Sequence, residues 1–483
     1  MSKMRTLFLI LATLFTSPLL GAGHDLSPSP PARHQIFPVV TGNGSGFMTA
    51  WPELAPPGHE LVVTQAVNAN GEPIAGTGTS SDQPAVYSIA IAHSPSSALA
   101  VWIANDNVVA ELLSPSGQTL NTILLTSGNS YPSGVAVAWN GSRYFVIWST
   151  ASQLLGAFVG PDGSSTTPRP VFTEPSLAGQ GPEELPVGPA VAWDGQHFIV
   201  VFAELPNRPC PILCPVPDPD RIRVMRVSAD GDAVDLSPLV ISGTHLRAHV
   251  ASSGAESLIT LDSRSGVTTI VVHNDQRGLT LDAEASLIQW FSEIWSDVVW
   301  DGATYTAGWR YAGSDTNWIA AAHLARSGLP FDYRFVTAGS LRSSWWGRPS
   351  IAVSDSGVAA LAVSEGTAAS AFDRARLYLA SELAPMPPPP PAPRNAVSYF
   401  GGNMARIDWQ SDADAASGFL IESSWDFGKH WNFYQTVPGN TRTITVYASV
   451  GNLFRVRAFG PGGVSDGTVT SIGSLPRSRA ARR

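Results

Sequence analysis

The stretch that decides the fold is residues 139–148, which read WNGSRYFVIW. Its Asn-Gly pair supplies the positive-φ residues that a tight hairpin turn requires. The residues before the turn, VAVA at 135–138, and those after it, from 144 onward, form apolar, β-rich runs. This segment therefore predicts two antiparallel strands joined at Gly141.

The same ten-residue frame returns along the chain. WDG at 193–195 leads to Phe202, and WDG at 300–302 leads to Trp309. Weaker copies begin at positions 42, 93, 252 and 354, which gives seven copies at spacings of 46 to 59 residues and a mean spacing of 52. A period in this range is typical of propeller blades rather than of helical repeats.

A second glycine turn follows the first in most copies. These turns lie at Asn70-Gly71, Ser116-Gly117, Asp162-Gly163, Asp230-Gly231, Arg277-Gly278 and Ser327-Gly328. Two hairpins per period make four strands, so the sequence predicts an all-β fold with a seven-bladed β-propeller over residues 24–383. The last copy is cut short at Leu383, and we expect a strand from residues 26 to 35 to complete its blade and close the ring.

Composition agrees with a modular β protein. The chain has 483 residues, more than one hydrophobic core normally organises. Charged residues make up 14%, against roughly 25% in typical soluble proteins, while glycine, proline and tryptophan are plentiful. The net charge is −9, and an acidic body with a short basic tail at 476–483 argues against nucleic acid as the partner.

The first 23 residues predict export. Lys3 and Arg5 precede an apolar run from Leu7 to Leu20, and small residues follow, as in a secretory signal peptide. No later run approaches the roughly 20 apolar residues that cross a bilayer. We therefore expect a monomer without a membrane span, either extracellular or periplasmic.

The chain has two cysteines, Cys210 and Cys214, close together in sequence. In an exported protein such a pair predicts a local disulfide, because the compartment is oxidising. A metal site would need more ligands than this pair, and no His-x-x-x-His or His-Glu-x-x-His pair occurs. We predict neither a metal nor another cofactor.

The repeat resembles a degenerate pattern of exported bacterial proteins, Val-Ala-Trp-Asp-Gly followed by Tyr-x-Val-Val-Trp, that is associated with propeller-like arrays. The resemblance covers residues 36 to about 383 and is clearest in the copies at 139, 193 and 300. It implies the same propeller fold that the period predicts.

A proline-rich segment at 384–393 separates the repeats from a different C-terminal part. We interpret it as a semi-rigid polyproline spacer, with a proline-binding partner as the alternative. Residues 394–475 resemble a fibronectin type III domain in Trp409, in GFLIESS at 418–424 and in FRVRA at 454–458. Asn452 stands where that family usually has its corner tyrosine, and the resemblance implies a role in spacing or adhesion.

Two motifs invite a catalytic interpretation that we do not adopt. Asp194 and Asp301 are candidate carboxylates, but Asn140 and Asn43 take the equivalent place in other copies, as a turn requires. The Ser-x-Asp-x-Gly pattern at 424–428 matches the Asp-box of sialidase-like propellers, yet it lies outside the repeats. We interpret both motifs as devices that stabilise hairpin turns, and we predict no catalytic residue.

Strand parity indicates where a ligand would bind. Successive connections within a blade alternate between the two faces, so the short glycine turns share one face and the longer connections share the other. The second face collects the insertion at 204–220 and four candidate ligand-binding tryptophans, which are Trp290, Trp295, Trp345 and Trp346. Exposed aromatics there would stack on sugars or bind protein, whereas buried ones would pack blades.

These features favour a secreted, non-enzymatic recognition or adhesion protein that binds a glycan or a protein through one propeller face. The alternative is a propeller-type carbohydrate-active enzyme, a glycosidase or lyase, with carboxylates at the axis. Two acids about 5 to 10 Å apart in a central cleft would favour the enzyme, and an apolar or plugged axis would favour the binder. A structural surface-layer part is a third interpretation, and it predicts no small-ligand cleft.

Overall fold

A computed structural model of the chain describes most of residues 23–473. The gaps are 28–32, 55–59, 84–85, 127–131, 151–152, 174–187, 205–220, 236, 244, 264–265, 276–277, 283, 290–293, 313–316, 339–347, 366–371, 386–389, 413–415, 417, 429–430, 450 and 461–462. The expected signal peptide, apart from Gly23, and the cysteine pair lie outside the described residues, as do Trp290, Trp345 and Trp346.

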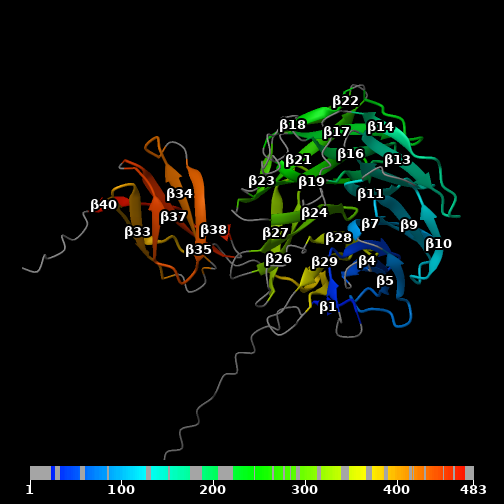
Figure 1. The fold of residues 1–483 in the computed structure, drawn as a ribbon, viewed down its shortest axis with the longest axis horizontal. Helices are drawn as coiled ribbons and strands as arrows, with labels where there is room; N and C mark the ends of the chain where they lie inside the picture. Colours follow the sequence, from blue (N-terminus) through cyan, green and yellow to red (C-terminus); the bar gives the residue numbers. More distant parts are fainter. Residues whose placement is uncertain are drawn as a thin grey trace, which may run out of the picture.

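In the described part of residues 24–385, the strands form seven antiparallel sheets of four or five strands, which we number in chain order (Figure 1). Sheets 1 to 3 contain β2 (His34–Gln35), β3 (Val39–Asn43), β4 (Gly46–Leu54), β5 (Glu60–Val67) and β6 (Thr79–Gln83); β7 (Val86–Ser94), β8 (Ser97–Ala104), β9 (Asn107–Leu113) and β10 (Thr119–Leu124); and β11 (Gly134–Trp139), β12 (Tyr144–Ser149), β13 (Gln153–Val159) and β14 (Arg169–Thr173).

Sheets 4 and 5 contain β15 (Ala190–Trp193), β16 (His197–Glu204), β17 (Arg221–Ser228) and β18 (Leu239–Ser242); and β19 (His245–Ser252), β20 (Glu256–Ser263), β21 (Gly266–Asp275), β22 (Gly278–Leu281) and β23 (Ala285–Gln289). Sheets 6 and 7 contain β24 (Ile294–Trp300), β25 (Tyr305–Ala312), β26 (Asn317–Leu324), β27 (Pro330–Ala338) and β31 (Ala384–Pro385); and β28 (Ser350–Val353), β29 (Ala359–Glu365), β30 (Arg374–Leu379) and β1 (His24–Asp25). The short 3-10 helix η1 (Ala380–Glu382) precedes β31.

Each of the seven repeated frames spans the turn between the first two main strands of one sheet. The Asx side chains close these turns locally: Oδ1 of Asn140 accepts the N–H of Arg143 at 2.9 Å, and Oδ1 of Asp301 accepts the N–H of Thr304 at 2.6 Å. Gly141 and Gly302 have φ of 94° and 97°, which disfavours any residue with a Cβ. These residues therefore stabilise the scaffold.

The last residue of each frame lies on the second strand and is buried between neighbouring sheets. These residues are Trp51, Trp102, Trp148, Phe202, Leu261, Trp309 and Val363. Among the described residues, seven apolar clusters join each sheet to the next, and one of them packs sheet 7 against sheet 1. The sheets thus form a closed ring, which is the architecture of a β-propeller (Figure 1).

The N-terminal strand that completes the last sheet differs in position from our expectation. Strand β1, at His24–Asp25, pairs with β30, upstream of the predicted segment at 26 to 35. His34 and Gln35 instead pair with β4 of sheet 1. Asp25 supports this pairing, because its carboxylate bonds to Arg374 at 2.9 Å and to Arg376 at 2.7 Å on the neighbouring strand.

The C-terminal part contains two further sheets among its described residues. One holds β32 (Arg394–Gly401), β33 (Met404–Gln410), β36 (Thr443–Tyr447) and β40 (Ser471–Gly473), and the other holds β34 (Gly418–Ser424), β35 (Asn432–Pro438), β37 (Leu453–Gly460), β38 (Gly463–Val464) and β39 (Thr468–Val469). Trp409 of the first sheet meets Phe419 of the second edge-on, with ring centroids 5.4 Å apart, inside a core of their own.

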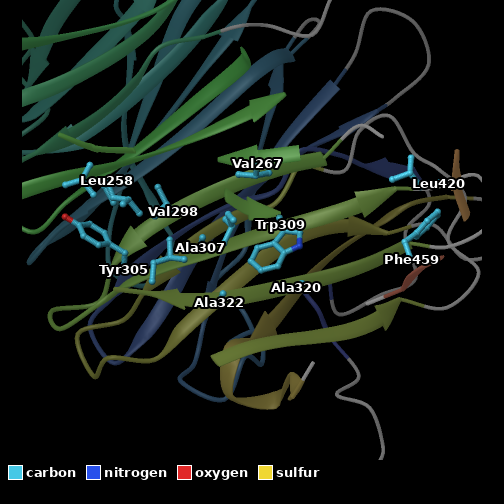
Figure 2. Packing of buried hydrophobic residues seen from close by; sticks show 14 residues of the cluster. Leu258, Val267, Val298, Tyr305, Ala307, Trp309, Ala320, Ala322, Leu420 and Phe459 are labelled. Carbon is cyan, nitrogen blue, oxygen red and sulfur yellow. The ribbon is translucent and has the colours of Figure 1, made fainter. Parts of the chain in front are cut away.

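The two parts of the molecule contact each other. Leu420 and Phe459 belong to the same apolar cluster as Val267, Leu287 and Trp309 of sheets 5 and 6. Figure 2 shows Leu420 and Phe459 at one end of this cluster. The expected spacer also begins on the propeller, because Ala384 and Pro385 pair with β27.

In the described part of the chain, no helix is long and apolar enough to cross a membrane.

Candidate functional site

A cavity of about 300 Å³ lies on the axis of the ring. Its lining comes from the first halves of the innermost strands β3, β7, β11, β15, β19, β24 and β28 and from the residues just before them. Each of these strands runs from the face of the longer connections towards the face of the short glycine turns. The cavity therefore lies towards the face on which the sequence predicted ligand binding.

The lining of the cavity has two unlike sides. Sheets 1 to 4 contribute a largely apolar wall, with Ser88 as a polar member, that includes Val39, Ile89, Ile91, Val135, Val137 and Val191. Sheets 5 to 7 contribute a polar wall, which contains Arg247, His249, Trp295, Ser296, Asp297, Arg348 and Ser350. Such a site suits an amphipathic ligand, and its volume is at the lower end of the range for small-molecule sites.

Trp295 is the centre of the polar wall, and it is 4% exposed. The guanidinium carbon of Arg247 lies 3.2 Å from the centroid of the indole ring, and that of Arg348 lies 4.6 Å from it. Arg348 also lies 5.4 Å from the ring of Phe37. These cation–π contacts hold both arginines at the cavity.

Of the two roles that the sequence left open for Trp295, exposed platform or buried packing residue, the structure shows the buried one. Its ring is covered by guanidinium groups, so it positions cations rather than offering a bare face to a sugar. A direct contact between Trp295 and a ligand stays a prediction. The other three candidate tryptophans and the predicted Cys210–Cys214 disulfide lie outside the described residues.

Two carboxylates accompany the arginines. Asp297 accepts the N–H of Val298 at 2.8 Å on Oδ1 and the N–H of Ile351 at 2.9 Å on Oδ2. Asp262, which is fully buried, accepts the hydroxyl of Ser296 at 2.5 Å and its N–H at 3.2 Å. Asp262 thus joins sheet 5 to sheet 6 through both of its oxygens, and Asp297 joins sheet 6 to sheet 7 through Oδ2 alone.

Burial sets the protonation of this cluster. Burial raises the pKa of Asp297 to about 7 and that of Asp262 to about 6, against the opposing effect of their hydrogen bonds. Burial, with the neighbouring charges of Arg348 and Arg247, lowers the pKa of His249 to about 3. Burial also lowers the pKa of Arg348 to about 10, so this arginine stays a cation at neutral pH.

Around the axis, a side chain of one inner strand often accepts the backbone N–H of the next. Ser88 accepts from Val135 at 3.3 Å, Ser350 accepts from Val40 at 3.3 Å, and Asp297 accepts from Ile351. Ser88, Asp297 and Ser350 stand five, three and four residues before the start of their frames, so no fixed frame position could have revealed them.

Sequence reasoning also missed the arginines of the cavity. Arg247 and Arg348 are isolated basic residues with no motif around them. Asp194 and Asp301, the candidate carboxylates of the repeat, cap their own turns, where Asp194 accepts the N–H of His197 at 2.6 Å. The described residues contain no group of three or more His, Cys, Asp or Glu side chains that could hold a metal ion.

Comparison of the chain with known proteins finds similar solved structures and no family. No protein-family model matches it, and no curated protein matches it. It is similar to the β-propeller domain of the Trilobed protease from Pyrococcus furiosus, at 7% identity, covering 72% of this chain and 96% of that chain with a TM-score of 0.41. It is also similar to a putative 6-phosphogluconolactonase from Bacteroides uniformis, at 14% identity, covering 73% and 97% with a TM-score of 0.42.

A third similar structure is a functionally unknown protein from Desulfotomaculum acetoxidans, at 12% identity, covering 64% of this chain and 87% of that chain with a TM-score of 0.41. The activities named for these proteins stay with them. The class that the ring of sheets defines is an all-β protein with a β-propeller. Its candidate site is an axial cavity with a cationic and an apolar side.

Proposed function

We propose that this protein is an exported, non-enzymatic recognition protein. A seven-bladed propeller binds a glycan or a protein ligand through the face of the longer connections, and residues 394–475 form a fibronectin type III-like module that spaces or tethers it. The seven sheets, one for each repeated frame, support the blade count. The two packed sheets around Trp409 support the sandwich.

One observation carries the proposal of recognition rather than catalysis. The axial cavity lies towards the predicted face, and the acids at its wall are engaged in structure. Asp297 lines the cavity, Asp262 is bonded to the lining residue Ser296, and both accept hydrogen bonds on both oxygens from the neighbouring sheet or from their own strand. What remains for a ligand is a cationic edge, an apolar wall and a small volume. These features can bind a ligand, and they supply no free carboxylate for catalysis among the described lining residues.

The proposal is tested by screening the mature protein on a glycan array and in pull-downs from extracellular material. Trp295→Ala alters the cavity, the double variant Trp345→Ala with Trp346→Ala alters the predicted loop face, and Gln196→Ala alters an exposed turn on the opposite face. We expect at least a tenfold loss of binding in one of the first two and wild-type binding in the third. A ligand that binds all three alike would place recognition elsewhere.

A carbohydrate-active enzyme is the second candidate, and one observation favours it. Asp297 lines the cavity with a pKa raised to about 7 by burial, which suits a general acid at neutral pH. Incubation of the mature protein with acidic and neutral polysaccharides decides between the two. Hydrolysis or elimination that Asp297→Asn abolishes, in a variant that still folds, would replace recognition by catalysis.

A further inference from the structure

One edge of the guanidinium of Arg348, a residue that lines the cavity, has no hydrogen-bond acceptor among the described residues, and we call it the open edge. Its Nε and Nη2 atoms are buried and have no hydrogen-bond partner in the described part of the chain. These two N–H groups lie on the same edge of the planar group, and this edge matches the two oxygens of a carboxylate. A buried cation without such a partner is costly to the fold, so the open edge requires an explanation.

Two other arginines of the same chain show what this edge binds. Arg226 donates from Nε and Nη2 to the carboxylate of Asp235, at 3.0 and 2.6 Å to the same Oδ1 atom. Arg455 donates from Nε and Nη2 to the two oxygens of Glu422, at 2.5 and 2.8 Å. At Arg348 the chain supplies the same donor edge without the acid.

The surroundings of Arg348 hold the guanidinium in place rather than neutralise it. Trp295 and Phe37 contact it through their rings. Asp262 attracts it, but both oxygens of that carboxylate are bonded to Ser296. The remaining charged groups on this wall are Arg247, which is a second cation, and Asp297, which is bonded to backbone N–H groups.

The shape of the cavity adds a second constraint. Across from the arginines, the walls of sheets 1 to 4 are apolar, with valine and isoleucine side chains at several inner strands. The volume of about 300 Å³ admits a ligand of roughly the size of one ring. A complementary molecule therefore carries a negative group at one end and a compact body at the other.

We propose that the axial cavity binds a carboxylate carried on a compact, ring-sized body, with Arg348 donating Nε–H and Nη2–H to the two carboxylate oxygens. The body lies against the apolar wall of Ile89, Val135 and Val191. This proposal rests on the recognition function proposed above and names the chemical class of its ligand. The carboxylate belongs either to an acidic sugar or to a free cyclic carboxylic acid.

The first test uses the wild-type protein and matched pairs of probes in isothermal titration calorimetry. Cyclohexanecarboxylate is compared with cyclohexanecarboxamide, and glucuronate is compared with glucose. We expect at least one acid to bind at least tenfold more tightly than its neutral partner, and the pair that shows this preference identifies the source. Equal binding of acid and neutral partner in both pairs, or no binding by either acid, would overturn the proposal.

The second test asks whether Arg348 is the receptor. Arg348→Lys keeps the positive charge and removes the two-donor edge, so we expect the acid to bind at least tenfold more weakly. Arg221→Lys, at an exposed arginine of β17 that does not line the cavity, is the matched control and should bind as the wild type does. Unchanged binding by a folded Arg348→Lys protein would refute the assignment, and if that variant does not fold, the probe pairs decide.

The two proposals fail in different ways. A ligand from the glycan array that lacks a carboxylate and binds Arg348→Lys normally would leave recognition standing and remove the carboxylate site. Preference for the acid in calorimetry, together with no glycan or protein ligand in the screens, would remove the wider recognition function and keep the small-molecule site.

Discussion

Asp297 combines two roles in one side chain. Its Oδ2 atom ties β24 to β28 through the N–H of Ile351, and the same carboxyl lines the cavity beside His249, whose Nδ1 lies 3.4 Å from Oδ1. Burial opposes ionisation, while the backbone donors favour it, and burial has the larger effect on the pKa. The residue therefore stabilises the ring most when it carries a proton.

This protonation predicts how stability changes with pH. The pKa of Asp297 is about 7 in the folded protein and near 3.8 when unfolded, so between these values the folded state binds a proton that the unfolded state releases. The contribution of Asp297 is thus fully present below about pH 4 and is lost as pH rises through 7. The stability of the wild type relative to Asp297→Asn should fall by more than about 1 kcal/mol from pH 5 to pH 8.

Urea denaturation of both proteins at the two pH values measures this difference, in which the contributions of Asp262 and His249 cancel to first order. Asp162→Asn is the control, because hydrogen bonds from Ser164 lower the pKa of that exposed carboxyl, which is ionised in both states across this range. A wild-type advantage that is constant or grows with pH would contradict the expectation.

At the scale of elements, the N-terminal strand that completes sheet 7 is very short. Strand β1 has two residues, and Leu26, directly after it, is fully buried between sheets 7 and 1 beside Phe47 and Leu377. The N–H of Leu26 donates to the carbonyl of Ala375 at 3.1 Å. A short strand can hold the closure because an apolar anchor and the ion pairs of Asp25 act at the same place.

We expect Leu26→Ala to lower the free energy of unfolding by about 2 to 4 kcal/mol, because it leaves a cavity at the junction of the first and last sheets. Leu124→Ala, at a side chain that is 58% exposed on β10, should change it by less than about 0.5 kcal/mol. Chemical denaturation of the two variants makes the comparison. Equal effects would show that this end of the chain does not stabilise the ring.

At the scale of the whole molecule, the C-terminal sheets are docked on the propeller rather than only spaced from it. Along β34, Phe419 and Ile421 point into the core of their own part, while Leu420, between them, is 1% exposed in the cluster with Trp309. On β37, Ala458 likewise packs into the core of the C-terminal part, and Phe459 packs into the cluster with Trp309. Because successive side chains of a strand point to opposite faces, one face of this sheet packs on the core of the C-terminal part and the other packs on the propeller.

Leu420→Asp should therefore separate the two parts without unfolding either, because the charge enters the contact and not the core. We expect a larger maximum dimension in small-angle X-ray scattering and two thermal transitions that lie further apart. Ile421→Asp, one residue on, should instead unfold the C-terminal part. A scattering profile of Leu420→Asp that matches the wild type would mean that the contact does not hold the parts together.

The repeat could be read from the sequence because its determinants are local. Asn140, Asp194 and Asp301 bond to backbone groups two and three residues away, and the neighbouring glycines supply positive φ, so the turns leave a visible pattern. The position of the closing strand could be read only approximately. The ion pairs of Asp25 with Arg374 and Arg376 join residues about 350 positions apart, and no local pattern records them.

The sequence by itself determined the period, the turns and the buried residue that ends each frame, because a hairpin and its second-strand side chain depend on neighbours within about ten residues. Only the tertiary structure decided the site. Phe37, Arg247, Trp295 and Arg348 stand in four different repeats, and they meet because the ring closes and its inner strands converge on one axis. The open edge of Arg348 is a property of that convergence.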